Sequence, residues 1–139
     1  MKFFVDENET AAIVQPLETV LFQHEFRSAE QEELGGVEDV DLFAEIARRG
    51  FDALITRDRN QLANRDERLK LIECGLHWIG HKEPGATGEL LISCLVAGYV
   101  LALPYVVSAV AELGAPHAFH VRNVEWQQGQ RVTIRELRR

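Results

Sequence analysis

The sequence predicts an α/β fold of one domain over residues 1–139: a three-layer α/β/α sandwich around a mainly parallel central sheet. Two short apolar runs, Phe3-Phe4-Val5 and Ala53-Leu54-Ile55, are typical of strands buried on both faces of a parallel sheet. Such runs alternate with segments of helical spacing, which favours right-handed crossovers and helices on both faces of the sheet. With 46% hydrophobic residues, the chain is large enough for a core of its own.

The first third of the chain predicts two strands separated by one helix. Lys2–Val5 is the first strand, and Thr10–Phe22 has the apolar spacing of a helix that Pro16 either starts or kinks. Glu25–Arg27 is a short second strand. An acidic loop that contains two glycines, Ser28–Glu38, follows it.

The middle of the chain predicts a helix, a buried strand, a charged helix and another strand. Asp39–Arg49 is the first of these helices, ending at Gly50, and Asp52–Ile55 is the strand that follows. Leu62–Cys74, closed by Gly75, and Leu76–Ile79 form the second pair. The apolar face expected for the first helix consists of Val40, Phe43, Ala44 and Ala47.

A stretch of 22 uncharged residues, Leu90–Ala111, is long enough to cross a bilayer. Acidic rather than basic residues flank it, and Pro104 interrupts it, so a buried pair of helices broken at this proline is the preferred interpretation. A dimer interface is a further interpretation, and no membrane association is expected. Ala118–Val121 and Arg131–Leu137 are expected to close the chain as strands, joined by a turn at Gln127–Gln130.

Charge is distributed unevenly along this acidic chain, whose net charge is −7. Twelve acidic residues and one basic residue lie between Asp6 and Glu45, whereas seven basic and four acidic residues lie between Arg48 and Lys70. Two interpretations stay open: solvated helix faces, or an acidic metal pocket flanked by phosphate-binding arginines. Two cysteines in apolar contexts and an N-terminus without a leader pattern predict a reduced, cytoplasmic protein.

Carboxylates follow two of the predicted strands directly. Asp6 follows the first strand and Asp58 follows the third, while Asp39 and Asp41 lie at the start of the helix that precedes the third strand. Helix starts and the carboxyl ends of parallel strands meet at one sheet edge, so these acids and Glu7 are expected to converge. Hard oxygen ligands of this kind suit Mg²⁺ or Mn²⁺.

Each of these acids also has an ordinary structural explanation. Asp39 is a good helix N-cap, Asp41 a good first-turn acid, and Asp58 a cap for the helix that follows it. Asp6, after a buried strand, is the hardest to explain structurally. The expected convergence of the four acids therefore carries the prediction more than any one of them.

The segments Val5-Asp6-Glu7-Asn8 and Thr56-Arg57-Asp58, with an acidic helix start between them, resemble short PIN-like domains related to the VapC-type toxin ribonucleases. The resemblance covers residues 1 to about 80. It implies a PIN-like α/β/α sandwich that binds Mg²⁺ or Mn²⁺. It further implies hydrolysis of RNA phosphodiesters by a metal-activated water, often by the toxin of a toxin–antitoxin pair.

The same resemblance assigns roles residue by residue. Asp6, Asp39 or Asp41, and Asp58 become metal ligands with Glu7 in reserve. Arg57 is expected either to clamp phosphate or transition-state charge, or to form a salt bridge with a neighbouring carboxylate. The predicted substrate-binding residues are Asn8, Thr56, Arg59 and Asn60. Asn60 stands near where the family often has another acid, and the acidic loop before Asp39 is longer than expected. The partners implied by the resemblance are RNA and an antitoxin protein, while the apolar stretch Leu90–Ala111 favours a second copy of the chain as a further partner.

Two alternatives to a nuclease remain at this stage. One is a PIN-like module with a degenerate site that binds RNA or a protein without cleavage, which Asn60 and the overall acidity favour. The other is a phospho-acceptor domain of receiver type, for which Lys82 is the single candidate lysine. The chain has no phosphate-binding G-x-x-x-x-G-K-[ST] loop. Its histidine pairs, His77/His81 and His117/His120, are not expected to bind zinc, because their spacings do not bring both rings onto one ion in strand-like segments.

Overall fold

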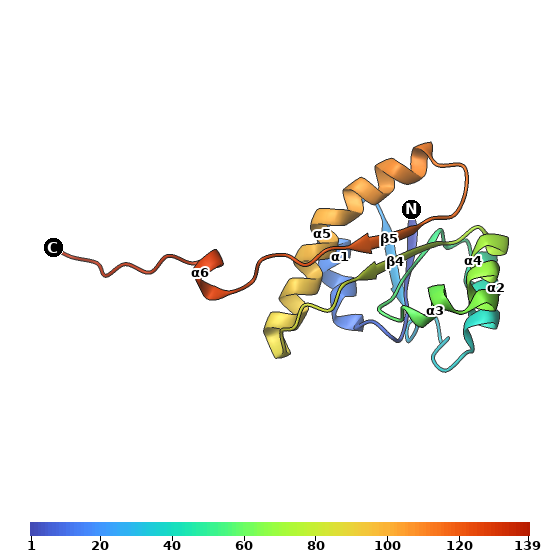
Figure 1. Cartoon of the computed structure of the whole chain (residues 1–139), viewed down its shortest axis with the longest axis horizontal. Coiled ribbons are helices and arrows are strands. Elements are labelled where there is room, and N and C mark those ends of the chain that lie inside the picture. The colour runs from blue at the N-terminus through green and yellow to red at the C-terminus, as the bar shows by residue number, and fades with distance from the viewer.

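A five-stranded, entirely parallel sheet in the order β2-β1-β3-β4-β5 forms the centre of the computed structural model, which describes residues 1–139 (Figure 1). Helices cover both faces of the sheet, so the predicted α/β/α sandwich is confirmed. The strands are β1 (Lys2–Val5), β2 (Glu25–Ser28), β3 (Ala53–Ile55), β4 (His77–His81) and β5 (Ala118–Val121).

One face of the sheet packs against α1 (Val14–Val20) and the long α5 (Gly88–Glu112), with a 3₁₀ turn, η1 (Ala11–Ile13), leading into α1. Thr10 caps this turn, because its hydroxyl oxygen accepts a hydrogen bond from the Ala12 amide at 3.2 Å. Pro16 lies in the first turn of α1, where its missing N–H is not needed, so it opens the helix rather than kinking it.

The opposite face packs against α2 (Asp39–Arg48) and α4 (Arg65–Cys74), with a single helical turn, α3 (Asn60–Ala63), beside them. The predicted helix Leu62–Cys74 is thus two elements, since Asn64 between them is extended. Its side-chain oxygen caps α4 by accepting hydrogen bonds from the Asp66 and Glu67 amides. Positive φ angles at Gly50 and Gly75 end α2 and α4 as expected.

The buried face of α2 differs from the prediction. Leu42, Phe43 and Ile46 are buried, whereas Val40 and Ala44 are exposed. The buried face of α2 is rotated relative to the predicted one, because burying the larger Leu42 and Ile46 removes more apolar surface from water than burying the alanines at the predicted positions would.

The predicted break at Pro104 is wrong, because α5 continues through it as one 25-residue helix. Pro104 is exposed, while buried side chains on both sides of it, among them Tyr99 and Val106, hold the helix on the sheet. Gly98 permits this close approach, because a Cβ atom there would lie 2.0 Å from the His81 ring nitrogen Nε2. By length and composition alone, α5 could cross a membrane, and 33% of its most apolar 18-residue window is buried in the domain.

The predicted final strand, Arg131–Leu137, is also wrong. Residues Gln128–Arg131 form a short helix, α6, and the chain beyond it is extended and unpaired as it leaves the domain (Figure 1). The apolar alternation of this segment is real, but no strand of the domain lies beside it. Both cysteines are free thiols, Cys94 buried and Cys74 half-buried.

Candidate functional site

The carboxyl ends of β1 and β3 bring Asp6 and Thr56 together at one sheet edge. The strands are neighbours in register, and the Asp6 amide extends their pairing by donating to the Ile55 carbonyl at 2.9 Å. Thr56, the residue after β3, donates its hydroxyl to Asp6 Oδ2 at 3.0 Å. Both side chains are buried, so the edge predicted from two sequence runs is a fixed structural contact.

Asp6 is held by four hydrogen-bond donors. Its Oδ2 atom accepts from Thr56 Oγ1, Asn8 Nδ2 and Gln61 Nε2, and its Oδ1 atom accepts from the Glu7 amide. Burial nevertheless raises the pKa of Asp6, against the lowering effect of these donors. The group is therefore a charge that the fold both orients and destabilises.

Asp39 is the second acid of the cluster. It is the first residue of α2, and its Oδ1 atom accepts a hydrogen bond from Gln61 Nε2 at 3.2 Å. The same Gln61 nitrogen lies 3.3 Å from Asp6 Oδ2. Burial, and next the negative charge of Asp6, raise the pKa of Asp39, so the two carboxylates are close enough to repel each other.

Gln61 is a site residue that the sequence did not reveal. It is fully buried in α3, and its Oε1 atom accepts a hydrogen bond from Trp78 Nε1 at 3.2 Å. Because an indole nitrogen can only donate, this contact turns the amide NH₂ toward Asp6 and Asp39. In the sequence, Gln61 stands in a polar stretch typical of a helix surface, and no signal there marks it.

Asp58 and Glu67 complete the acidic cluster. The charges of Asp39 and Asp58 add to burial in raising the pKa of Glu67, and the charge of Asp58 also contributes to the raised pKa of Asp39. Asp58 Oδ1 additionally accepts from the amide of Asn60, the first residue of α3, although Arg59 and not Asp58 is the N-cap of this helix. Glu67 was missed because the predicted helix started at Leu62; the true start at Arg65 puts Glu67 in the first turn.

Two predicted reserve ligands lie apart from these acids. Glu7 Oε2 accepts a hydrogen bond from the Gly36 amide in the acidic loop, and Asp41 is exposed in the first turn of α2. A hollow of about 580 Å³ opens beside Asp6 and is lined by further acids, namely Glu7, Glu9, Glu30 and Glu33. The surroundings of Asp6 are thus strongly negative on this side.

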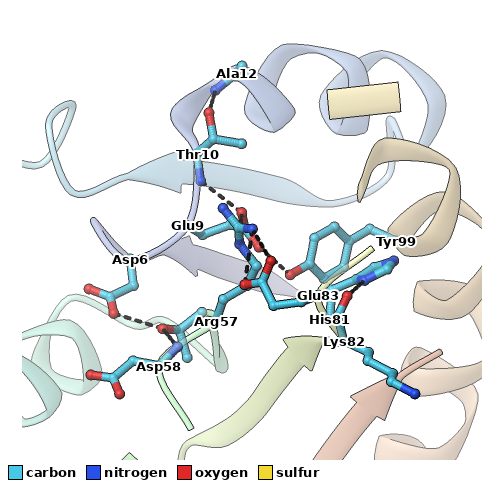
Figure 2. Close-up of polar contacts among 11 residues, drawn as sticks. Asp6, Glu9, Thr10, Ala12, Arg57, Asp58, His81, Lys82, Glu83 and Tyr99 are labelled. Carbon is cyan, nitrogen blue, oxygen red and sulfur yellow. Dashed lines mark hydrogen bonds and ion pairs between the residues drawn. The ribbon is translucent and has the colours of Figure 1, made fainter. Parts of the chain in front are cut away.

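Arg57 turns away from Asp58 and lies between the buried acid Glu9 and the exposed acid Glu83 (Figure 2). Its Nε atom lies 2.9 Å from Glu9 Oε1, and its Nη1 atom donates to Glu83. Tyr99 of α5 donates its hydroxyl to Glu9 Oε2 at 2.6 Å, which ties the helix to the sheet edge. The Arg57 guanidinium is therefore already paired, and its role as a phosphate clamp stays a prediction.

The remaining predicted residues flank the cluster. Arg59 and Asn60 are exposed at the start of α3, and Asn8 is exposed beside Asp6, to which it donates at 3.3 Å. Of the predicted substrate-binding set, Thr56 alone is buried. Three exposed polar side chains thus border buried Asp6 and the half-buried acids of the cluster.

The donor set of this edge fits a hard divalent cation. Four carboxylates gather there, and no arginine or lysine is bonded to Asp6, Asp39 or Asp58. As the side chains stand, no three of them are close enough to coordinate one ion, and the Gln61 amide lies between Asp6 and Asp39. The residues match Mg²⁺ or Mn²⁺ in chemistry, while Gln61 takes the bridging position.

A family model described as a PIN-like domain matches residues 1–82, which contain β1 to β4 and every member of the acidic cluster. The chain belongs to the PIN-like domain family. PIN-like domains are generally nucleases, so the family places this chain within a nuclease-type superfamily. No curated protein and no solved structure matches the chain. Of the PIN-like fold, α5, β5 and the C-terminal segment lie beyond the matched residues.

Proposed function

We propose that this PIN-like protein is a metal-dependent endoribonuclease. The observation that carries the proposal is the gathering of Asp6, Asp39, Asp58 and Glu67, from four different segments, at the carboxyl edge of the parallel sheet. Like charges that are partly buried raise one another's pKa values, and a divalent cation is the partner that relieves this repulsion.

Asp6, Asp39 and Asp58 would hold Mg²⁺ or Mn²⁺, with Glu67 as the further acid of the cluster and with Asp41 and Glu7, which lie apart from it, in reserve. The cation, when bound, supplies an acidified water and neutralises charge on the phosphodiester. Thr56 and Asn8 hold the Asp6 carboxylate in one orientation through their hydrogen bonds to Oδ2.

Substrate phosphate would meet the exposed polar rim beside these acids. Arg59 is exposed one residue after Asp58 and has no carboxylate bonded to it, which makes it a better candidate for phosphate contact than the paired Arg57. Asn60 and Asn8 offer amide donors on the same rim. These contacts would position the RNA, because the chain's acidic surface otherwise repels it.

Toxin activity in a toxin–antitoxin pair is the biological role that fits a short PIN-like ribonuclease. Under this proposal the antitoxin would be a protein partner that blocks the acidic edge, and the protein would act on RNA in the cytoplasm. The toxin role and the antitoxin follow from the resemblance of the DEN and TRD segments to the VapC-type toxins, and the cytoplasmic location rests on the two free cysteines.

A second candidate function is a PIN-like module that binds without cleavage. The Gln61 bridge favours it, because a neutral amide already satisfies both Asp6 and Asp39 where a cation would stand. The acidic hollow beside Asp6 favours a basic protein segment over RNA as the ligand of such a module.

The deciding experiment is cleavage of a mixed-sequence RNA with Mn²⁺, with Mg²⁺ and with a chelator. The nuclease proposal predicts internal cuts that require metal and disappear in Asp39→Asn and Asp58→Asn, with folding unchanged by circular dichroism. In both variants the remaining amide oxygen can still accept the hydrogen bond from Gln61 (at position 39) or from Asn60 (at position 58). Asp6→Asn is less suitable, because its NH₂ group would either face the donors around Asp6 or leave one of the four hydrogen bonds unmade. Metal-dependent activity that persists in both variants would overturn the assigned site.

A further inference from the structure

The α5–β5 groove is an apolar surface outside the PIN-like match. It has a volume of about 690 Å³ and lies between the outer side of α5 and the last strand of the sheet. Leu101 and Tyr105, 64% and 79% exposed, stand on its helix side, and Phe119 and Val121 on its strand side. Large apolar side chains gathered in this way on a surface mark an interaction site.

The strand side of the groove has free backbone groups. β5 pairs with β4 on one side and with no strand on the other, so it is an edge of the sheet. The edge strand Ala-Phe-His-Val contains no proline or lysine, and its only protection against pairing is its length of four residues and the charge of Arg122 directly after it. An added strand would find both hydrogen-bonding groups and an apolar wall.

The C-terminal segment Gln127–Arg139 has the properties of such a strand. Every hydrogen bond and ion pair of these residues lies within the segment, and all of them are exposed. Val132 and Ile134 alternate with Arg131, Thr133 and Arg135, the pattern of a strand with one apolar face. Isolated, these residues have no neighbour to pair with.

The chain is anchored so that the segment leaves its own domain. Asn123 donates to the Glu83 carbonyl at 3.0 Å, and Trp126 donates its indole N–H to the Pro84 carbonyl at 3.1 Å. Both contacts hold residues 122–126 on the loop between β4 and α5. Beyond them the segment projects outward (Figure 1), where a second molecule can receive it.

We propose that the segment Gln127–Arg139 of one copy adds a strand to β5 of a second copy and buries Val132 and Ile134 in the α5–β5 groove. The exchange is reciprocal, so each copy gives one segment and receives one, as a closed two-fold dimer requires. The overall charges are opposite, because four arginines and one glutamate give the segment +3 and the other residues of the −7 chain carry −10. The groove itself has one charged lining residue, Arg122, so apolar contact and strand pairing carry the binding there.

The test measures the mass of the full chain in solution by sedimentation equilibrium and compares three variants. The proposal predicts a dimer for the full chain and a monomer for the chain that ends at Trp126. Ile134→Asp should raise the dimer dissociation constant at least about a hundredfold, because it puts a charge into an apolar groove. Thr133→Asp is the matched control; it adds the same charge on the outward face and should change the constant far less.

A mixing experiment checks that the segment and the groove belong to different copies. Leu101→Asp changes an exposed groove residue, so the variant keeps the core intact and its segment functional. Alone, it and Ile134→Asp should each be monomeric, whereas a mixture should recover a heterodimer through one intact contact.

Three results would overturn the proposal. A full chain that is monomeric at high protein concentration would exclude exchange between copies. The same result would be seen if the segment folded onto the groove of its own chain. A dimer that survives truncation would assign the interface to α5 alone. If the full or truncated chain does not dimerise but is recovered bound to lipid vesicles of mixed zwitterionic and anionic composition, the apolar face is a membrane-binding surface. None of these results would bear on RNA cleavage.

Discussion

The indole Nε1 of Trp78 donates a hydrogen bond to Oε1 of Gln61 at 3.2 Å, and this contact fixes which end of the Gln61 amide faces the acids. Both side chains are almost completely buried, so the orientation does not depend on solvent. The NH₂ group consequently lies between Asp6 and Asp39 and offsets part of their repulsion. A residue from β4 thus sets the electrostatics of carboxylates that follow β1 and begin α2.

Replacing Gln61 with glutamate should couple stability to metal. Without metal, Gln61→Glu adds a buried carboxylate beside buried Asp6 and half-buried Asp39, and the free energy of unfolding should fall by about 2 kcal/mol or more. With Mn²⁺ the added ligand charge should lower the dissociation constant about tenfold and restore the lost stability. Urea unfolding and calorimetric titration measure the two effects.

Asn60→Asp is the matched control, because it makes the same change of charge at the exposed neighbouring position. Its unfolding free energy should change by about 0.5 kcal/mol or less. Equal behaviour of the two variants, with or without Mn²⁺, would contradict the view that Gln61 occupies the position between the acids.

Tyr99→Phe should destabilise the domain, because it removes the hydroxyl that donates to the buried Glu9 carboxylate. We expect a loss of about 1–3 kcal/mol in the free energy of unfolding, the usual cost of an unsatisfied buried acceptor. Tyr105→Phe, the same change on the outer face of α5, should cost about 0.5 kcal/mol or less. Denaturant unfolding of the two variants in parallel decides the point; similar losses would argue against a stabilising Tyr99–Glu9 bond.

Arg57 should prove to be a structural partner of Glu9. Arg57→Met leaves the Glu9 carboxylate buried and unpaired, with an expected cost of about 3–5 kcal/mol. Adding Glu9→Gln to this variant should recover much of the loss, so a double-mutant cycle would show strong coupling. Normal stability of Arg57→Met together with slow RNA cleavage would instead support the phosphate clamp.

Stability should depend on pH through Asp39. Burial and the charge of Asp6 raise the pKa of Asp39 above its usual 3.8 in the folded state, so the folded protein binds more protons than the unfolded chain between the two values. The difference in the free energy of unfolding, wild type minus Asp39→Asn, should therefore fall as the pH rises from 3.8 through the raised pKa. Above that pKa the difference should stay level. Metal-free urea unfolding at several pH values measures the difference, and a difference that rises with pH would refute the assigned shift.

The sequence predicted the sheet well because its strands are buried on both faces and end at acids. The runs before Asp6 and Thr56 have no other stable placement in a domain of this size, and the parallel order follows from the helices between them. The same logic correctly brought Asp6 and Asp39 together. It failed at Pro104, where packing of α5 on both sides of the proline outweighs its helix-breaking tendency.

Side-chain partners in the site were beyond sequence reasoning for a physical reason. Gln61 acts through Trp78, seventeen residues away, and Arg57 pairs with Glu9 and Glu83, from segments on either side of it. Such contacts depend on rotamers and on where the short helix α3 stops and α4 begins. Asn64 sets that boundary, because its side chain caps α4. The strand predicted at Arg131–Leu137 failed because apolar alternation is visible in a sequence, whereas the absence of a neighbouring strand is not.

The most direct test of a metal-dependent nuclease is calorimetric titration of Mn²⁺ into wild type, Asp39→Asn and Asp58→Asn, followed by RNA cleavage with the same samples. We expect saturable binding to wild type that is at least about tenfold weaker in each variant, with cleavage lost in parallel. Wild-type protein that binds no Mn²⁺ at millimolar concentration would contradict it, and the PIN-like binding module would then be the better description.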